Sequence, residues 1–396
     1  MAIYDLSQSC LSCPNPRCEG KCPTGNHIRD FIALVKQGKE EEASRVLYST
    51  NPFPELTSQL CDHKRQCQGA CVRGIKGNPV AIPQIEFGLS SHPWPYQRKA
   101  ANGKTVACIG AGPANLSAAV FLSPEGYAVE IFEREASLGG AILTGIPNWR
   151  FPKETLTNIQ NKMEGLGIVF HFNRFIPKME IPNFQQKYDY VILGIGAEVE
   201  NKAGQTLSQD VVGGLSLLRE LNIEQREDAY RSYRRAYVWG GGNVAMDCAR
   251  SLKRIMGDVA ILYRRSEKEM PASEIEVEEA KSEGIAMATL TNLKELRYDE
   301  NGRLKGGLLV KMELGEPDAS GRASFHEIPG SEYEESFDLF VLAIGEKPNA
   351  EYLAGHTGEY PYLDRVYVVG DARYGARNIA SAIADGRNLA KKIIEN

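Results

Sequence analysis

Seven of the nine cysteines in this chain lie within its first 71 residues. Four of them follow the spacing Cys10-x2-Cys13-x4-Cys18-x3-Cys22, and Pro23 comes directly after. Cysteines crowded into one segment, in a chain without an export signal, favour metal ligation over a disulfide framework. The N-terminal segment is therefore predicted to carry a metal centre whose thiolate ligands sit in turns.

The composition and charge exclude several classes of protein. A net charge of −5 and an isoelectric point near 5.9 give no general attraction for nucleic acid. No apolar run approaches the roughly 18 residues needed to cross a bilayer. The first residues have neither the basic region nor the apolar core of a secretory signal. We therefore expect a cytoplasmic protein that binds neither nucleic acid nor a membrane.

The hydrophobic pattern changes along the chain, and 396 residues are too many for one ordinary core. Residues 28–47 carry an amphipathic helical pattern that is interrupted near Gly38. From Lys104, short apolar strands alternate with helices, which is typical of a parallel α/β sheet. The predicted fold class is α/β, with an N-terminal α-helical metal-binding domain followed by two Rossmann-like nucleotide-binding domains. The predicted boundaries are 1–103 for the helical domain and linker, 104–200 with 346–396 for the first nucleotide domain, and 201–345 for the second.

An internal repeat supports the two nucleotide domains. The strand at 106–109 leads into one glycine-rich turn, the strand at 237–239 leads into another, and each half later ends in a similar apolar strand. Residues 293–336, with turns at Asp299–Gly302 and Asp318–Gly321, are predicted to form a β-meander inserted in the second half. The segment from about residue 346 is predicted to return to the first half.

The first glycine fingerprint is Gly110-Ala-Gly112-Pro113-Ala114-Asn115. Its first glycine permits a tight turn, and its second lets the backbone approach a pyrophosphate at a helix N-terminus. Asn115 replaces the third glycine, so we expect looser packing of helix on strand but an intact phosphate turn. Glu133 ends the next strand, where a carboxylate can bind ribose hydroxyls. An empty glycine turn is the alternative.

The second fingerprint begins at Gly240 and has Ala245 at its third position. Its second strand ends in Arg264-Arg265, at nearly the spacing that Glu133 has in the first half. An acid at this place favours a free ribose 2′-hydroxyl, whereas arginines favour a 2′-phosphate. The second site is therefore predicted to bind NADPH, with a solvated basic strand end as the alternative.

Together these motifs resemble the small (beta) subunit of NADPH-dependent glutamate synthase and its relatives. The relatives include the flavin half of dihydropyrimidine dehydrogenase and the large subunit of the NADH-dependent ferredoxin:NADP oxidoreductase. The similarity extends over nearly the whole chain. Its markers are Cys10–Pro23, Gly110–Ala114, Gly145–Pro152, Gly240–Asp247, Tyr263–Arg265, Met270–Ser273 and Gly370-Asp371.

The resemblance implies FAD on the first fingerprint and NADPH on the second. It assigns to FAD the residues Gly110, Gly112, Pro113, Ala114, Glu133, Gly139, Gly140, Arg150, Gly370, Asp371 and Ile379. It assigns to NADPH the residues Gly240, Gly242, Asn243, Val244, Arg264 and Arg265. An aspartate such as Asp371 can accept hydrogen bonds from ribityl hydroxyls. The helix that begins near Ile379 would present its N-terminus to the flavin.

The same resemblance implies two 4Fe–4S clusters in the N-terminal domain. The first would be held by Cys10, Cys13, Cys18 and Cys71. The second would be held by Cys22, Cys61, Cys67 and a fourth ligand that is not cysteine, for which Glu86 falls in place. Structural zinc is the rival, but seven cysteines divide poorly into four-cysteine zinc sites.

No catalytic side chain is predicted. Cys108 and Cys248 lack the paired cysteine of a flavin disulfide reductase, and both are expected in packed cores. Hydride transfer from a nicotinamide to a flavin needs aligned rings rather than an acid or a base. The absence of a catalytic triad therefore does not argue against an enzyme.

The sequence thus predicts an NADPH-dependent FAD and iron–sulfur oxidoreductase that passes electrons to a partner subunit. The glutamate synthase large subunit is the leading partner. A pyrimidine-reducing subunit or a ferredoxin-type carrier is next, and a stand-alone NADPH diaphorase and a non-enzymatic binding module are the remaining alternatives.

Overall fold

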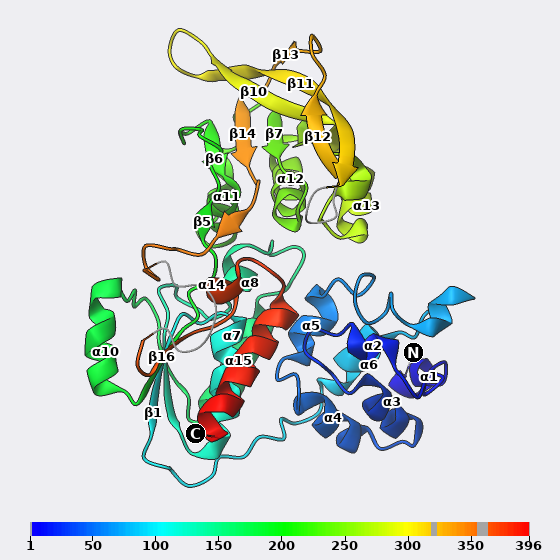
Figure 1. Ribbon diagram of the computed structural model, residues 1–396, viewed down its shortest axis with the longest axis vertical. Helices are drawn as coiled ribbons and strands as arrows, with labels where there is room; N and C mark the ends of the chain where they lie inside the picture. Colours follow the sequence, from blue (N-terminus) through cyan, green and yellow to red (C-terminus); the bar gives the residue numbers. More distant parts are fainter. Residues whose placement is uncertain (1, 318–322, 355–362, 396) are drawn as a thin grey trace. The chain divides into compact units, whose positions relative to one another are not determined.

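The chain divides into two compact units, and the computed structural model describes residues 2–317, 323–354 and 363–395 of them (Figure 1). The first unit comprises Met1–Ile142, Phe151–Ala197 and Pro348–Asn396, and the second comprises Leu143–Arg150 and Glu198–Lys347. The predicted helical domain and most of the predicted first nucleotide domain both fall within the first unit. Residues 143–150, which the sequence placed in the first nucleotide domain, pack with the second unit. The turn expected at Asp318–Gly321 lies outside the described residues.

The N-terminal part of the first unit consists of short helices around one apolar core. The amphipathic pattern at residues 28–47 forms α3 (Ile28–Lys36) and α4 (Glu40–Tyr48), and the chain turns between them at Gly38 with a φ of +73°. Phe31 and Leu47 are fully buried between the helices. The other helices of this part are α1 (Ile3–Ser7), α2 (Arg17–Gly20), α5 (Pro54–Leu60), the 3-10 helix η1 (Val72–Ile75) and α6 (Ile82–Leu89).

The linker after α6 joins this helical part to the α/β part of the same unit. Tyr96 packs edge-on against Trp94 and Phe121, with ring centroids 5.5 and 5.9 Å apart. Lys162 also bridges the two parts, because its Nζ lies 2.9 Å from Glu55 Oε1. The helical part is therefore fixed against the α/β part rather than tethered to it by a loose segment.

A parallel five-stranded sheet of order β16-β4-β1-β2-β3 forms the α/β part of the first unit. The C-terminal segment returns to this sheet, since β16 pairs with β4 in parallel. The strands are β1 (Thr105–Ile109), β2 (Ala128–Phe132), β3 (Val169–His171), β4 (Tyr190–Leu193) and β16 (Val366–Val368). The helical segments are α7 (Pro113–Leu122), η2 (Ser123–Glu125), α9 (Glu154–Gly165), η3 (Lys178–Glu180), α10 (Ile181–Lys187), α14 (Asp371–Tyr374) and α15 (Ile379–Glu395), and α8 (Ala141–Thr144) spans the boundary with the second unit.

The second unit has a parallel sheet of its own, with the order β6-β14-β7-β8-β9. As in the first sheet, the strand before the glycine turn lies between the next strand and the strand that ends the half. The strands are β6 (Val211–Gly213), β7 (Ala236–Trp239), β8 (Val259–Tyr263), β9 (Ala286–Thr289) and β14 (Leu339–Leu342), and the short β5 (Val199–Glu200) pairs with β15 (Glu346–Lys347). The helical segments are α11 (Gly214–Asn222), η4 (Glu227–Ala229), α12 (Asn243–Met256), η5 (Glu267–Glu269) and α13 (Glu274–Ser282).

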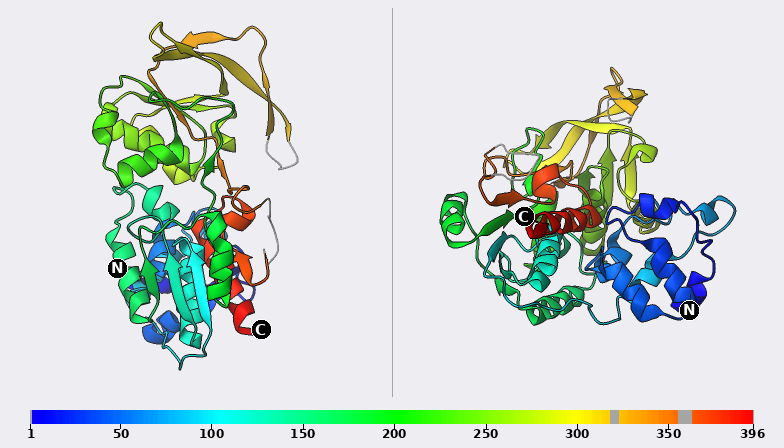
Figure 2. Two further views of the ribbon diagram at one scale, coloured as in Figure 1. Left: turned by 90° about the vertical axis from the view of Figure 1, so that its left-hand side faces the viewer. Right: turned by 60° about the horizontal axis from the view of Figure 1, so that its bottom comes forward.

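The meander predicted in the second half is an antiparallel sheet in which both β10 and β12 pair with β11, and β13 pairs with β11 as well. Figure 2 shows these strands, coloured yellow to orange, as a layer beyond the parallel sheet of the same unit. Their bounds are β10 (Thr291–Tyr298), β11 (Leu304–Pro317), β12 (Ala323–Glu327) and β13 (Tyr333–Glu335). In the described ranges, no helix has both the length and the apolar character that crossing a bilayer requires.

Candidate functional site

The first fingerprint forms the turn between β1 and α7. Gly110 has a φ of +93°, and a Cβ on it would lie 2.6 Å from the carbonyl oxygen of Gly194, so a side chain is excluded. Gly112 caps α7 in extended conformation, and a Cβ there would meet nothing closer than 3.9 Å. This open face at the start of the ten-residue α7 fits a pyrophosphate held by backbone N–H groups. Pro113 occupies the first position of the helix, where its missing N–H costs no hydrogen bond.

Asn115 does not loosen the packing of α7 on the sheet, contrary to the sequence-based expectation. Its side chain is fully buried, and Nδ2 donates to the carbonyl oxygens of Ile109 and Gly110, both at 2.8 Å. The amide has room because Gly194 lies opposite, where a Cβ would stand 2.6 Å from Asn115. Asn115 therefore links α7 to β1 by hydrogen bonds, whereas a glycine at this position would only permit the helix and the strand to approach each other.

Glu133 points back at the same turn. Its Oε2 accepts the N–H of Ala111 at 2.6 Å, and its Oε1 accepts the N–H of Glu135 at 2.9 Å. Burial raises the pKa of this carboxyl group, while these two hydrogen bonds act in the opposite direction. Each oxygen retains acceptor capacity, so the position suits a ribose hydroxyl.

Three further residues assigned to FAD lie around this turn. Gly139 donates its N–H to Ala111 O at 2.8 Å, and Gly140 approaches so closely that a Cβ would lie 3.0 Å from the Cα of Gly112. Gly370 lies against α7 too, since a Cβ on it would be 2.9 Å from the Cβ of Ala114. Five of the predicted residues thus meet at the N-terminus of one helix.

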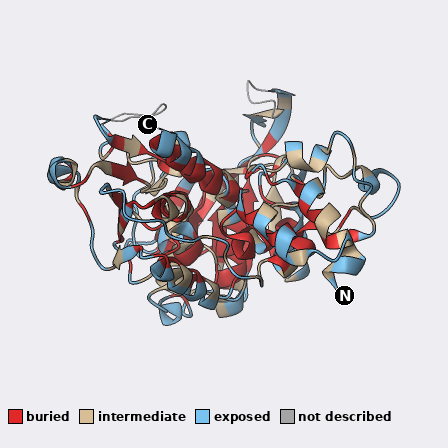
Figure 3. Ribbon diagram, turned by 90° about the horizontal axis from the view of Figure 1, so that it is seen from below, coloured by how far each residue is buried: buried red, intermediate tan, exposed pale blue. Residues whose placement is uncertain are grey.

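Asp371 begins α14, directly after β16. Burial raises the pKa of its carboxyl group, and its Oδ1 accepts the N–H of Arg377 at 3.2 Å. Ile379 is the first residue of α15, where the Asn378 side chain caps the helix by accepting the N–H of Ser381 at 2.9 Å. The first half of α15 is buried nearly all round, and exposed residues appear only from Asn388 onward (Figure 3). Binding of the flavin by these residues stays a prediction.

The second fingerprint repeats the geometry of the first. A Cβ on Gly240 would lie 2.0 Å from Ala343 O, whereas one on Gly242, which caps α12, would meet only a Pro271 carbon at 3.9 Å. Asn243 is exposed and its Oδ1 accepts the N–H of Ser273 at 2.9 Å, while Val244 is half-buried. The open face at the start of α12 therefore also fits a pyrophosphate.

The two arginines at the end of β8 have different surroundings. Arg265 is 4% exposed, and its Nε donates to Ala323 O on β12 at 2.7 Å. Arg264 is half-buried, and its guanidinium lies 4.4 Å from the ring centroid of Phe325. Binding of a 2′-phosphate by these arginines stays a prediction.

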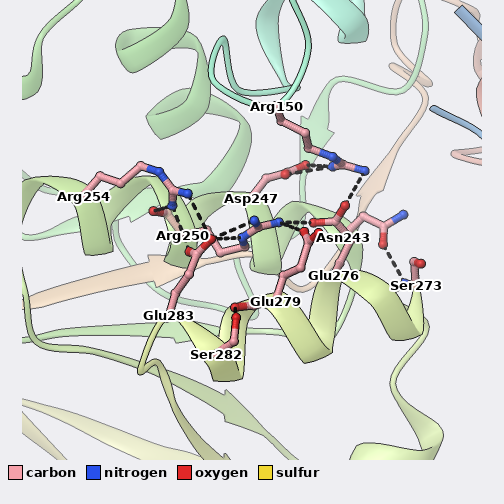
Figure 4. A network of polar contacts seen from close by, with 10 residues as sticks. All are labelled: Arg150, Asn243, Asp247, Arg250, Arg254, Ser273, Glu276, Glu279, Ser282 and Glu283. Atoms are coloured by element: carbon pink, nitrogen blue, oxygen red, sulfur yellow. Dashed lines mark hydrogen bonds and ion pairs between the residues drawn. The ribbon is translucent and has the colours of Figure 1, made fainter. Parts of the chain in front are cut away.

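Arg150 lies within a network of charged side chains in the second unit (Figure 4). Its guanidinium contacts Asp247 on α12 at 2.8 Å and Glu276 on α13 at 2.8 Å. Arg250 extends the network, pairing with Glu276 at 2.6 Å and with Glu283 at 2.8 Å. The structure thus engages Arg150 with the second unit, and its contact with FAD stays a prediction.

The first set of cysteines surrounds a common cavity. Cys10, Cys13, Cys18 and Cys71 all line one cavity, together with residues of α3 and η1. Among the described residues, no three ligand side chains converge as they would on a single metal ion. Four thiols around a shared space instead fit a cluster with several irons. Burial raises the pKa of Cys18 to about 11, so ligation must displace its proton.

The second set is more deeply buried. Cys67 is 5% exposed, and burial raises the pKa values of Cys22, Cys61 and Cys67, with the charge of Glu86 adding to each shift. Glu86 itself is 4% exposed on α6, and burial raises its pKa to about 7. A buried carboxyl group that acts on the pKa values of all three thiols suits a fourth ligand of this set, and this role of Glu86 stays a prediction.

Sequence analysis missed the residues that hold Glu86. Its Oε1 accepts hydrogen bonds from Asn51 Nδ2 at 2.8 Å and from Thr57 Oγ1. Both partners are fully or nearly fully buried polar residues, Asn51 in the connection between α4 and α5 and Thr57 in α5. The polar residues at 50–58 within an otherwise apolar segment were the only signal available in the sequence.

Two cysteines stand apart from the clusters. Cys108 on β1 and Cys248 on α12 are fully buried, and Cys248 Sγ donates to Gly214 O at 3.4 Å. Both lie in packed cores, as expected from the sequence, and they belong to different units.

Comparison with known proteins identifies the class. Residues 2–92 match the family described as dihydropyrimidine dehydrogenase domain II, 4Fe-4S cluster, and residues 104–386 match the pyridine nucleotide-disulphide oxidoreductase family. The structure of Mycobacterium tuberculosis FprA in complex with NADPH aligns with a TM-score of 0.62 over 74% of this chain and 84% of that one, at 18% identity, which shows the fold alone. The protein is an NADPH-dependent FAD and 4Fe–4S oxidoreductase, and the zinc alternative falls.

The closer sequence relatives give the family. The glutamate synthase [NADPH] small chain of Escherichia coli is 32% identical over 97% of this chain and 89% of its own length. The beta subunit of the NADP(+)-dependent formate dehydrogenase of Moorella thermoacetica is also 32% identical, over 95% of this chain and 59% of its own length. The chain belongs to the family of the glutamate synthase small chains, which confirms the resemblance stated above.

Proposed function

We propose that this chain is the electron-input subunit of a larger enzyme and that the large subunit of a glutamate synthase is its partner. The relatives support this proposal, because one is a glutamate synthase small chain and another is a formate dehydrogenase beta subunit. Bound FAD would accept a hydride from NADPH and release electrons singly to two 4Fe–4S clusters. In this proposal the α12 turn would hold NADPH, the α7 turn would hold FAD, and the two cysteine sets would hold the clusters.

The border of the first cysteine cavity carries the proposal. Arg17, Arg29 and Arg73 line this cavity, although the chain as a whole has a net charge of −5. Arg29 is paired with Asp30, whereas Arg17 and Arg73 are exposed and form no ion pair within the described ranges. The border of the cavity is therefore positively charged, whereas the whole chain has a net negative charge.

Exposed apolar side chains lie on the same border. Leu11 lines the cavity and is 61% exposed, and Ile75, at the end of η1, is 71% exposed. Apolar side chains among cations, beside a redox centre, suit docking of an acidic protein surface. We therefore assign this face to an electron-accepting partner with acidic residues around its own redox centre.

Anaerobic purification from the native cell, with mass spectrometry of the proteins that come with it, tests the assignment. A stoichiometric glutamate synthase large subunit supports it. A pyrimidine-reducing or ferredoxin-type partner changes the pathway but keeps the role of input subunit. A solitary protein that turns over with oxygen overturns the role and makes the chain an NADPH diaphorase.

Charge reversal then tests the docking face. Arg17→Glu and Arg73→Glu should each weaken partner binding by about tenfold or more at low salt, with little change at high salt. Lys202→Glu, an exposed charge in the second unit, is the matched control. Iron content and the rate of FAD reduction by NADPH without partner report whether the variants stay intact. Equal binding by all three variants would exclude this face.

A further inference from the structure

Arg387 is a buried cation on α15, and no carboxylate among the described residues pairs with it. The residue is 8% exposed, and within the described ranges it forms no ion pair. Its Nη1 donates to the carbonyl oxygens of Thr24 and Thr50, both at 2.6 Å, and its Nη2 donates to Asn388 Oδ1 at 3.3 Å. Its Nε is buried and has no hydrogen-bond partner in the part of the chain that the structure describes.

Such a residue is costly to keep in a folded protein. Burial of a charge disfavours folding unless an opposite charge and a full set of hydrogen bonds compensate it. Burial lowers the pKa of Arg387, and the charge of a Cys22 thiolate acts in the opposite direction. The acidic groups that face this arginine are Tyr96 of the linker and Cys22, a predicted ligand of the second cysteine set.

The hydrogen bonds of Arg387 lead directly to that set. Thr24 Oγ1 lies 3.0 Å from Cys22 Sγ and donates to Asn26 Oδ1 at 2.8 Å. Thr50 Oγ1 donates to the same Asn26 oxygen at 3.0 Å. One guanidinium thus joins the loop that carries Cys22 to the segment of Thr50.

The segment of Thr50 leads on to the carboxylate of Glu86. Asn51 follows Thr50, and its Nδ2 donates to Glu86 Oε1 at 2.8 Å. Arg387 is therefore connected with Cys22 through Thr24, and with Glu86, the proposed oxygen ligand of the second set, through Thr50 and Asn51.

The helix that carries Arg387 is fixed against the first fingerprint. Gly386 packs on α7 so closely that a Cβ would lie 1.9 Å from the Ala114 carbonyl oxygen. One turn earlier, Ser117 Oγ on α7 donates to Ile383 O at 2.8 Å. The same rigid element therefore begins at Ile379, the position assigned to the flavin, and holds a cation at the second cysteine set.

We propose that Arg387 is a positioning residue that supplies the counter-charge of the cluster in the second cysteine set and raises its reduction potential. This inference rests on the function proposed above. A one-electron reduction, with the electron coming from NADPH through FAD, adds one negative charge to the cluster, and a fixed cation nearby favours the more negative state. Arg387 thereby makes this cluster the better acceptor for electrons from the flavin side.

Redox titration of the anaerobically purified protein, followed by electron paramagnetic resonance, tests the proposal without any partner or activity. Arg387→Gln should lower the reduction potential of one cluster by at least about 59 mV, which is a tenfold change in the equilibrium constant of a one-electron couple. The potential of the other cluster should stay unchanged. Arg387→Lys keeps the charge and should stay near the wild-type potential. Lys391→Gln removes an exposed charge from the same helix and should shift neither cluster, because solvent screens it.

Unchanged potentials in Arg387→Gln, with full iron content, would overturn the proposal. If Arg387→Gln loses iron, the potentials of Arg387→Lys test the proposal instead. A shifted potential in Arg387→Lys would mean that the geometry of the side chain matters rather than its charge, and this result would also overturn the proposal. Failure of the proposed partner leaves these potentials as they are. The absence of a cluster from the second cysteine set removes this inference alone.

Discussion

Arg150 donates two hydrogen bonds from Nη1 to the two carboxylate oxygens of Asp247, at 2.8 and 2.9 Å. The neighbouring Trp149 lies over Arg250 and Arg254, whose guanidinium carbons are 4.5 and 3.8 Å from its ring centroid. Asn222 Nδ2 donates to two backbone carbonyls of the same segment. Residues 143–150 are thus fastened to the second unit at three places, which explains why they pack there rather than with the first unit.

Arg150→Ala should destabilise the second unit by about 3 kcal/mol. The substitution leaves Asp247 and Glu276, which are 6% and 8% exposed at the side chain, without one of their cations. Thermal unfolding, monitored by hydrogen exchange of the α12 amides, would measure the loss of stability.

Arg254→Ala is the control for that experiment, because Arg254 belongs to the same network but is 39% exposed and should cost less than about 1 kcal/mol. The FAD content of Arg150→Ala separates the two roles of Arg150. Loss of FAD with unchanged stability would show that the flavin, not Asp247, is its main partner.

Asp247 should give the second unit a specific pH dependence. Burial raises its pKa from 3.8 to about 6, although Arg150 acts in the opposite direction. The folded protein therefore binds this proton more strongly than the unfolded chain, and the resulting stability is full below pH 3.8 and is lost as the pH rises through 6. Between pH 5 and 7, the wild type should lose about 1 kcal/mol relative to Asp247→Asn. Thermal unfolding at a series of pH values, with iron content checked at each, measures the difference, and parallel profiles would contradict it.

The two arginines after β8 should separate in their effects on nucleotide binding. Arg264→Ala should raise the KM for NADPH by about ten- to a hundredfold and change that for NADH little, because a charged contact with the 2′-phosphate is lost. Arg265→Ala should weaken both nucleotides and lower stability, since its Nε holds Ala323 O on β12. Steady-state kinetics with both nucleotides gives the comparison.

Phe325→Leu is the matched control, because it removes the ring on which both arginines lie but leaves both charges. It should produce a smaller loss that is again selective for NADPH. An equal loss of NADPH and NADH in Arg264→Ala would sink the assignment of the 2′-phosphate.

The backbone of the site was predictable from sequence, because its causes are local. Strand, glycine turn and helix follow one another within a few residues at Gly110 and at Gly240, and both turns have the predicted form. The side-chain partners were not predictable in the same way. Arg150 meets Asp247, which lies 97 residues away, and only the packing of the 143–150 segment on α12 brings them together.

Substitution at a motif position also had a consequence that sequence alone did not give. Asn115 was expected to weaken the packing of α7, yet it tightens it by two hydrogen bonds. The compensating feature is the missing side chain at Gly194, on a different strand connection. The sequence of the motif alone does not reveal such a pair, because Gly194, the compensating residue, lies across the sheet from Asn115.

Glu86 should prove to be a ligand of one cluster only. Its carboxylate is buried beside the second cysteine set. Asn51 and Thr57, which lie 35 and 29 positions earlier in the sequence, orient it by hydrogen bonds. Glu86→Ala should therefore lower the iron content by up to half and remove one cluster signal in electron paramagnetic resonance, while the other signal keeps its shape and potential. Ser58→Ala is the control, because this neighbouring hydroxyl is buried without a hydrogen-bond partner in the described part of the chain and its removal should change neither cluster. Full iron content and two unaltered signals in Glu86→Ala would remove Glu86 from the ligand set and leave the second cluster to be completed by another group.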